Sequence, residues 1–156
     1  MNGIAIRQAA DAADMARART LFLEYAEWLQ VDLCFQGFDR ELATLPGAYA
    51  PPDGRLFLAL DGEDAAGCIA LRRFDAARGE VKRLYVRPAY RGMRLGERLA
   101  LLVIEAARVI GYRALLLDTL AQMHAAHALY GRMGFRDIPA YYHNPIPGAV
   151  YMELEL

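Results

Sequence analysis

Residues 87–96 combine the residue types that bind a phosphate group. They follow an apolar strand pattern and precede a helical pattern, so their backbone N–H groups lie at a helix start and lack helical partners. Gly92 and Gly96 have no Cβ and allow an anion to approach the backbone, while Arg91 and Arg94 add charged donors. Neither the G-K-[ST] of a P-loop nor G-x-G-x-x-G is present. The segment alone predicts either a phosphate cradle or a loop with solvated arginines.

The same segment resembles the coenzyme A motif of the GNAT superfamily of N-acetyltransferases, [QR]-x-x-G-x-[GA]. Here it reads RGMRLG over residues 91–96, with Arg94 at the first motif glycine. The superfamily's second motif, N-x-x-A-x-x-L-Y-x-x-x-G-F, is matched over residues 123–135 at its alanine, Leu-Tyr and Gly-Phe positions. Met123 replaces its asparagine. Because both motifs occur in order and are joined by the expected helix and strand, the resemblance covers residues 55–135 specifically.

The resemblance implies acetyl-CoA as cosubstrate and no metal. Its pyrophosphate would bind the glycine-containing loop, and its pantetheine amides would pair with a splayed strand edge as an added strand does. The cofactor contacts implied are Leu84, Tyr85, Val86, Arg91, Gly92, Met93, Arg94, Leu95 and Gly96.

Two residues are implied to move protons during acetyl transfer. Tyr130 would protonate the departing thiolate, for which a phenol is a competent acid; the alternative is a tyrosine that packs its helix against the sheet. Glu80 would accept the proton of the amine, directly or through water. Its alternatives are a solvated strand-edge carboxylate or a partner for Lys82. His124 or His127 is a further candidate base, although polar residues on a half-exposed helix explain both.

An aromatic, proline-rich loop and the first helix are predicted to flank the acceptor amine. Tyr141, Tyr142 and Asn144 lie in the loop, where aromatic faces and hydroxyls suit an amine; a structural hairpin or a dimer contact explains it equally well. Trp28 and Phe35 would form the opposite wall, although Trp28 also fits a core position. Asp118 interrupts an apolar strand. It would bind backbone, cap the next helix or line the cleft.

Hydrophobic periodicity predicts the elements that position these residues. Helices are expected from Asp11 or Asp14 to about Gln30 and at residues 39–45, 94–110 and 123–133. Strands are expected at residues 3–7, 55–60, 66–73, 80–86, 114–120, 135–138 and 150–156. The strand–helix–strand unit over residues 80–120 favours a parallel, right-handed crossover. With the resemblance, this predicts a mixed α/β fold: a mostly antiparallel sheet splayed between two parallel strands, with helices on both faces.

Composition restricts the functions available to the chain. Its 156 residues fit one domain over residues 1–156, and 56% are hydrophobic. A net charge of −1 without a basic run disfavours nucleic acid. No apolar run reaches membrane-spanning length, and neither Cys34 nor Cys68 sits in a C-x-x-C pair. These features predict a cytoplasmic protein, and the GNAT resemblance implies an N-acetyltransferase of small-molecule or peptide amines that can form a homodimer. The alternatives are a non-catalytic acyl-CoA-binding regulatory domain and a protein N-terminal acetyltransferase.

Overall fold

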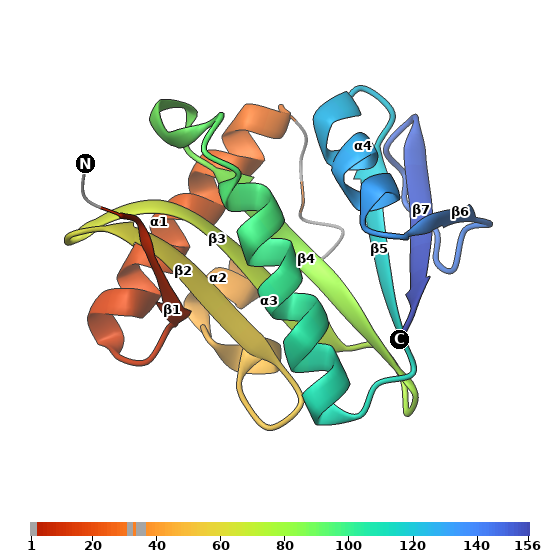
Figure 1. Cartoon of the computed structure of the whole chain (residues 1–156), viewed down its shortest axis with the longest axis horizontal. Helices are drawn as coiled ribbons and strands as arrows, with labels where there is room; N and C mark the ends of the chain where they lie inside the picture. The colour runs from red at the N-terminus through yellow and green to blue at the C-terminus, as the bar shows by residue number, and fades with distance from the viewer. Residues whose placement is uncertain (1–2, 31–32, 34–36) are drawn as a thin grey trace.

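The computed structural model describes residues 3–30, 33 and 37–156. Seven strands form one twisted sheet in the order β1-β2-β3-β4-β5-β7-β6 (Figure 1). The strands are β1 (Ala5–Gln8), β2 (Arg55–Asp61), β3 (Asp64–Arg73), β4 (Arg78–Val86), β5 (Ala114–Leu120), β6 (Arg136–Ile138) and β7 (Ala149–Glu155). Among the described strands, the β4–β5 pair is parallel and the other pairs are antiparallel. The predicted mixed α/β fold is confirmed.

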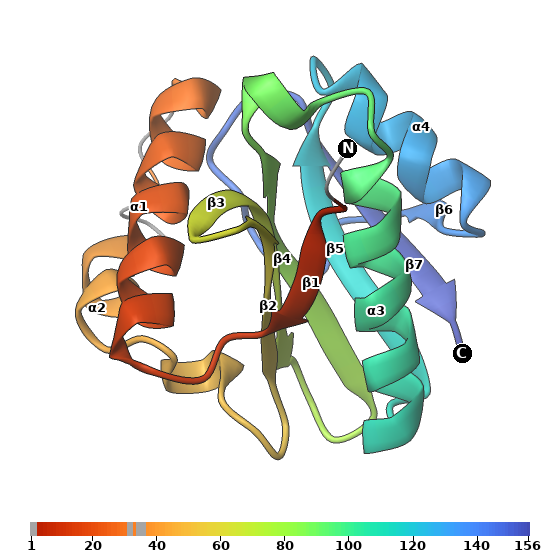
Figure 2. The same ribbon diagram turned by 60° about the vertical axis from the view of Figure 1, so that its left-hand side comes forward.

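Helices cover both faces of this sheet. They are α1 (Ala12–Leu29), α2 (Phe38–Ala43), α3 (Leu95–Ile110) and α4 (His124–Arg132), with short 3₁₀ helices at Gly47–Tyr49 and Pro88–Tyr90. Figure 2 shows α1 and α2 on one side of the sheet and α3 and α4 on the other. Each face has its own apolar core, centred on Leu21 and Phe22 on the α1 side and on Leu99 and Val103 on the α3 side.

The parallel strands β4 and β5 pair over three residues and then separate. Arg78, Gly79 and Glu80 lie opposite Ala114, Leu115 and Leu116, and no further pairing joins these two strands. The edge of β4 after Glu80 is therefore left without a strand on the β5 side. Backbone groups at such an edge need another partner, so the splay creates the place where a ligand can complete the sheet.

The first helix shows how local sequence sets the frame. Asp11 caps α1 by accepting a hydrogen bond from the Asp14 N–H at 2.9 Å, as the sequence predicted. Asp14 is fully buried and accepts from both Arg7 and Arg17. Charge-assisted hydrogen bonding by Arg7 lowers the pKa of the Asp14 carboxyl to about 2. These contacts fasten α1 to strand β1.

The predicted elements all appear, with ends that move by a few residues. Strand β5 has the predicted ends, whereas β4 begins at Arg78 because that residue pairs with Ala114 and Gly79 pairs with Arg73. No helix within the described residues is long and apolar enough to cross a membrane. The interpretation of Trp28 as a core residue is wrong, since 46% of it is exposed.

Candidate active site

An open groove of about 570 Å³ lies where β4 ends and α3 begins. Residues that line it include Val86, Arg91, Gly92, Arg94, Leu95 and Gly96, with Ala125, Leu129 and Arg132 of α4 opposite. The first turn of α3 presents unpaired N–H groups to such a groove, and exposed arginines flank it. The groove can therefore attract an anionic group to the start of α3.

The loop that builds this groove holds two left-handed residues. Gly92 has φ +84°, and a Cβ there would meet open space. Arg94 has φ 59° and is the N-cap of α3, without a side-chain hydrogen bond to cap it. Glycine adopts this conformation at the least cost, which gives a physical reason for a motif glycine at this position. Arg94 adopts this left-handed conformation at a cost of about 1 kcal/mol, and its guanidinium adds a positive charge to the groove.

Ion pairs fix the loop against α1. Arg87 bonds both carboxylate oxygens of Glu24, at 2.9 and 2.6 Å, and donates to the Ala65 carbonyl at 2.8 Å. The Arg91 guanidinium lies 4.8 Å from the centre of the Trp28 ring. Trp28 therefore sits beside the cofactor loop, so its exposed ring can report on that loop.

A small cavity of about 60 Å³ lies between the separated ends of β4 and β5. Its wall includes Leu84, Asp118 and Tyr130. Tyr130 is 5% exposed and packs against Phe135 with ring centres 5.3 Å apart. Burial raises the pKa of its phenol, which stays protonated at neutral pH. Desolvation also raises the proton affinity of any thiolate placed in this cavity.

A β-bulge shapes one wall of that cavity. Cys68 lies opposite Tyr85 and Ala70 opposite Lys82, so β4 carries one extra residue between these pairs. Arg83 adopts φ 61° within this stretch. Its buried guanidinium bonds Glu41 of α2 through Nε and Nη2, each at 2.9 Å. The bulge thus directs the Arg83 side chain toward α2, where it pairs with Glu41.

Glu80 is buried on the α2 face of the sheet, with 1% of its side chain exposed. Its Oε1 accepts from Arg72 Nε at 2.8 Å, and Arg72 Nη2 lies 2.8 Å from the same oxygen. Its Oε2 accepts from the Tyr141 hydroxyl at 2.7 Å. Burial and the adjacent Glu80 raise the pKa of Tyr141. The interpretation of Glu80 as a solvated strand-edge carboxylate is therefore wrong.

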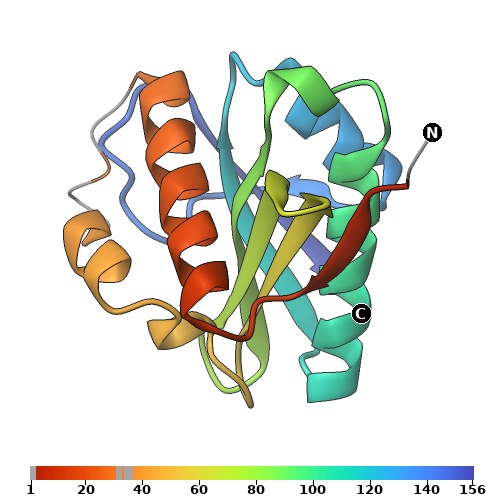
Figure 3. The same ribbon diagram turned by 90° about the vertical axis from the view of Figure 1, so that its left-hand side faces the viewer.

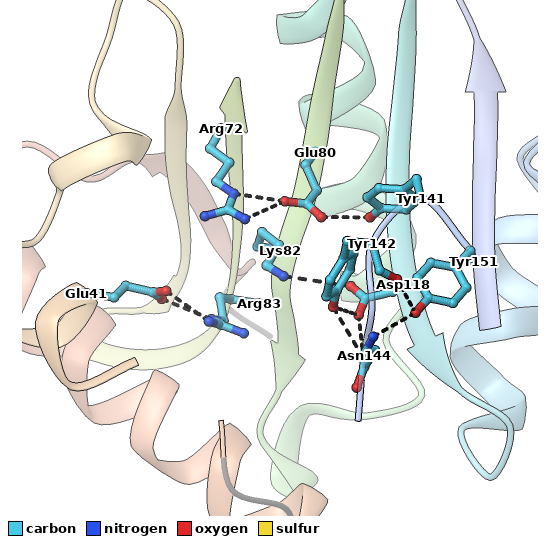
Figure 4. Close-up of polar contacts among 10 residues, drawn as sticks. All are labelled: Glu41, Arg72, Glu80, Lys82, Arg83, Asp118, Tyr141, Tyr142, Asn144 and Tyr151. Carbon is cyan, nitrogen blue, oxygen red and sulfur yellow. Dashed lines mark hydrogen bonds and ion pairs between the residues drawn. The ribbon is translucent and has the colours of Figure 1, made fainter. Parts of the chain in front are cut away.

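The neighbouring strand contributes a second buried carboxylate, Asp118. It accepts from the Tyr142 hydroxyl in a short hydrogen bond and from Asn144 Nδ2 at 2.9 Å. Lys82 Nζ lies 3.7 Å from the other Asp118 oxygen, and burial lowers the pKa of this ammonium. Figure 4 shows Tyr141, Tyr142 and Asn144 on one side of Lys82, with Arg72, Arg83 and Glu41 on the other. The N-cap of α4 is Met123, without a side-chain hydrogen bond, and Asp118 accepts no hydrogen bond from the backbone of a described residue, so those two expectations are wrong.

Comparison with known proteins identifies the fold and its family. The acetyltransferase (GNAT) family model matches residues 16–135. The chain belongs to the GNAT acetyltransferase family. It is 41% identical over 145 residues to an uncharacterized N-acetyltransferase of Schizosaccharomyces pombe, covering 92% of this chain and 89% of the relative.

Solved GNAT structures share the fold. An acetyltransferase from Streptococcus agalactiae superposes with a TM-score of 0.82 at 23% identity, covering 100% of both chains. PaiA N-acetyltransferase from Thermoplasma acidophilum, solved in complex with coenzyme A, superposes with a TM-score of 0.74 at 18% identity, covering 99% of this chain and 100% of that one. Family membership carries acetyltransferase activity in general, without naming the acceptor.

The GNAT fold divides the predicted site residues between the groove, the cavity and the network around Glu80. Leu84 and Tyr130 line the central cavity, whereas Met93 packs against the α3-side core. Figure 3 shows the segment between β6 and β7 on the side of the sheet that α1 and α2 cover, where Tyr141 meets Glu80. Phe35 lies outside the described residues, as does Cys34. Within the described part, no cluster of three or more His, Cys, Asp or Glu forms a metal site.

Other candidates lie away from the gap. His127 bonds Asp137 at 2.9 Å on the exposed face of α4. Cys68 is buried, and desolvation raises the pKa of its thiol.

Sequence reasoning missed the roles of Arg72 and Glu41. No local pattern marks either residue, because their partners Glu80 and Arg83 lie on another strand. Lys82 did carry a signal: it is the only lysine in the chain, against seventeen arginines. A lysine whose pKa falls on burial differs in chemistry from any arginine.

Proposed function

We propose that the chain acts as one acetyltransferase domain over residues 1–156 and moves an acetyl group from acetyl-CoA to the primary amine of a small molecule or peptide. The observation that carries this proposal is the continuity of three features. The cavity at Tyr130 and the open groove at the α3 start lie next to each other along the free edge of β4: Leu84 and Ala126 line the cavity, and Val86 and Ala125 line the groove. Bound acetyl-CoA would supply the activated acetyl group there.

The chain's own residues then hold and move protons. The Tyr141 hydroxyl takes up the proton that the amine loses while its own proton passes to Glu80 Oε2, so Glu80 is the final acceptor. Tyr130 Oη donates a proton to the leaving thiolate. A backbone N–H within residues 84–86 at the free β4 edge polarises the reacting carbonyl. Asp118 orients Tyr142 and Asn144 as a positioning residue.

Trp28 offers a direct test of cofactor binding, because it is the only tryptophan and contacts Arg91. Titration with acetyl-CoA should change its fluorescence and raise the melting temperature. The double variant Arg91→Ala/Gly96→Asp should lose both responses. A folded protein that shows neither response at millimolar acetyl-CoA contradicts the proposal.

An amine screen for thiol release then separates the proposed enzyme from a regulatory acyl-CoA-binding domain. Release of coenzyme A that depends on an added amine supports direct transfer. Tight acetyl-CoA binding without release from small amines or peptides with a free N-terminus supports the regulatory alternative. Turnover restricted to peptides supports the protein N-terminal acetyltransferase.

The identity of the base has its own test, since two carboxylates flank the gap. Glu80→Gln should lower kcat by about 100-fold and remove the acidic limb of the pH–rate profile. Asp118→Asn is the matched comparison and should retain that limb. If Asp118→Asn removes the limb while Glu80→Gln keeps it, Asp118 is the base.

A further inference from the structure

A second hollow lies on the α2 side of the sheet and takes no part in the proton path. It has a volume of about 240 Å³ and is formed by α2, the turn after it and strand β3. The residues that give it chemical character are Arg40, Glu41, Thr44, Tyr49 and Arg72. The side chains in its wall carry more hydrogen-bond donors than the single carboxylate among them, that of Glu41, can accept.

The charges around this hollow do not balance. Three guanidinium groups, those of Arg40, Arg72 and Arg83, meet the carboxylates of Glu41 and Glu80. Arg83 binds both oxygens of Glu41, and Arg72 binds Glu80. Arg40 is exposed and forms no ion pair within the described part of the chain. Among the described residues around the hollow one positive charge is therefore in excess, so the hollow attracts an anion.

Unused donors lie in the same wall. Arg72 uses Nε and Nη2 on a single oxygen of Glu80, which leaves Nη1 available. Tyr49 is 2% exposed, and its buried hydroxyl has no hydrogen-bond partner among the described residues. Burial raises the pKa of this phenol, the nearby Arg83 guanidinium lowers it, and the Glu41 carboxylate raises it. A buried hydroxyl without a partner is rare in a folded protein and is explained by a ligand that supplies one.

A single pair of side chains separates this hollow from the cavity near Tyr130, where we propose that the reaction takes place. Glu41 lines the hollow and Arg83 lines the cavity near Tyr130, so their ion pair separates the two spaces. Arg72 links the hollow to Glu80 in the same way. Figure 4 shows Arg72, Glu41 and Arg83 together on the side of Lys82 opposite Tyr141. An acceptor that reaches from the hollow to Glu80 would therefore have to displace one of these two ion pairs, Arg72–Glu80 or Arg83–Glu41.

We infer that this hollow binds a carboxylate of the acceptor, so that the preferred substrate is an amine that carries a carboxylate on the same small molecule. The planar forks of Arg40 and Arg72 match the two oxygens of a carboxylate, and the Tyr49 hydroxyl adds a third donor. The position of the amine rests on the proposed acetyl transfer. The anion site rests on the contacts of the hollow alone.

Binding of acetylated amino acids and their amides tests the inference without turnover. The probes are N-acetylglycine, N-acetylaspartate and N-acetylphenylalanine, each against its carboxamide, titrated by calorimetry in the presence of coenzyme A. At least one carboxylate should bind about tenfold more tightly than its amide. Equal affinities within every pair, or no binding of any carboxylate at millimolar concentration, overturn the inference.

Three variants locate the effect. Arg40→Gln removes an exposed, unpaired cation, and Tyr49→Phe removes only the hydroxyl while its ring still packs against Phe22. Each should reduce the preference for carboxylate by about tenfold or less and leave acetyl-CoA affinity unchanged. Arg113→Gln, an exposed arginine outside the hollow, is the matched control. A preference that survives both Arg40→Gln and Tyr49→Phe overturns the inference.

The outcomes separate this site from the proposed function. One outcome is that acetyl-CoA binds and added amines cause release of coenzyme A, but the carboxylates bind no more tightly than their amides. In that case the acetyl transfer stands and the anion site fails. If carboxylates bind in an Arg40-dependent way but no amine releases thiol, the anion site stands and the proposed function fails. Competing inorganic phosphate separates general anion binding from carboxylate recognition: equal affinity for phosphate overturns the carboxylate assignment.

Discussion

The two sides of the gap between β4 and β5 are built in opposite ways. The cofactor side comes largely from residues 86–97, is open to solvent and presents backbone N–H groups with exposed arginines. The acceptor side draws Arg72, Glu80, Lys82, Asp118 and Tyr141 from three strands and a distant loop, and Glu80 and Lys82 are buried.

This difference separates two kinds of binding site. A site made of backbone N–H groups depends on the local backbone conformation. One substitution that blocks the approach of the ligand can therefore weaken binding without unfolding the protein. A buried charge network needs several distant side chains at once, and the desolvation of its charges opposes folding. The cofactor side can therefore stay constant while the acceptor side changes its charged residues to suit another amine.

The largest expected effect lies where the two sides meet, at Tyr130. Tyr130→Phe keeps the ring contact with Phe135 and removes the proton that we propose passes to the thiolate. We expect kcat to fall by about 100-fold or more, with unchanged affinity for acetyl-CoA and for the acceptor. Steady-state kinetics beside acetyl-CoA titration measures this. Full turnover in the variant would show that Tyr130 only packs α4 against the sheet.

A smaller effect should separate binding from stability on the cofactor side. A Cβ at Gly96 would meet Leu129 Cδ2 at 3.5 Å, an ordinary contact, so Gly96→Ala should fold normally. The added methyl group stands in the path of the pyrophosphate, and we expect the dissociation constant of acetyl-CoA to rise about tenfold.

Gly131→Ala in α4 is the matched control, because its Cβ would meet nothing within 4 Å. It should bind acetyl-CoA like the unaltered protein. Equal loss of binding in both variants, or a lower melting temperature for Gly96→Ala alone, would contradict a backbone site at Gly96.

The smallest effect concerns stability on the acceptor side. Burial lowers the pKa of Lys82 from its usual 10.5, so between the lowered value and 10.5 the unfolded chain binds a proton that the folded chain does not. Stability of the unaltered protein should therefore rise with pH in this window. Lys82→Met lacks this dependence and should be equally stable, or more stable by about 1 kcal/mol, near pH 7.

Urea unfolding of both proteins from pH 7 to 10.5 measures the difference, which should shrink as pH rises. Because Lys82 is the only lysine, ¹⁵N-lysine labelling also reports its side-chain titration directly. A difference that grows with pH would show that the ammonium's attraction to Asp118 and Glu80 outweighs its burial.

Sequence patterns predicted the frame because they are local. The period of apolar residues placed all seven strands and four helices, and the glycines and arginines of residues 91–96 sit at the helix start where the pattern put them. Side-chain environments were predicted less well. Trp28 fits a helical apolar stripe, yet it is exposed beside Arg91, because the cofactor loop comes from another part of the chain.

The sequence by itself determined the element order, the family resemblance and the position of the glycine- and arginine-containing loop at the start of α3, since each depends on residues that are neighbours in the chain. Only the tertiary structure decided that Glu80 is buried between Arg72 and Tyr141 and that Asp118 holds Tyr142 and Asn144. It also decided that Arg40, in the wall that contains Tyr49, forms no ion pair with another described residue. The physical reason is that burial and charge pairing depend on which distant side chains share a small volume, and a local pattern carries no record of that.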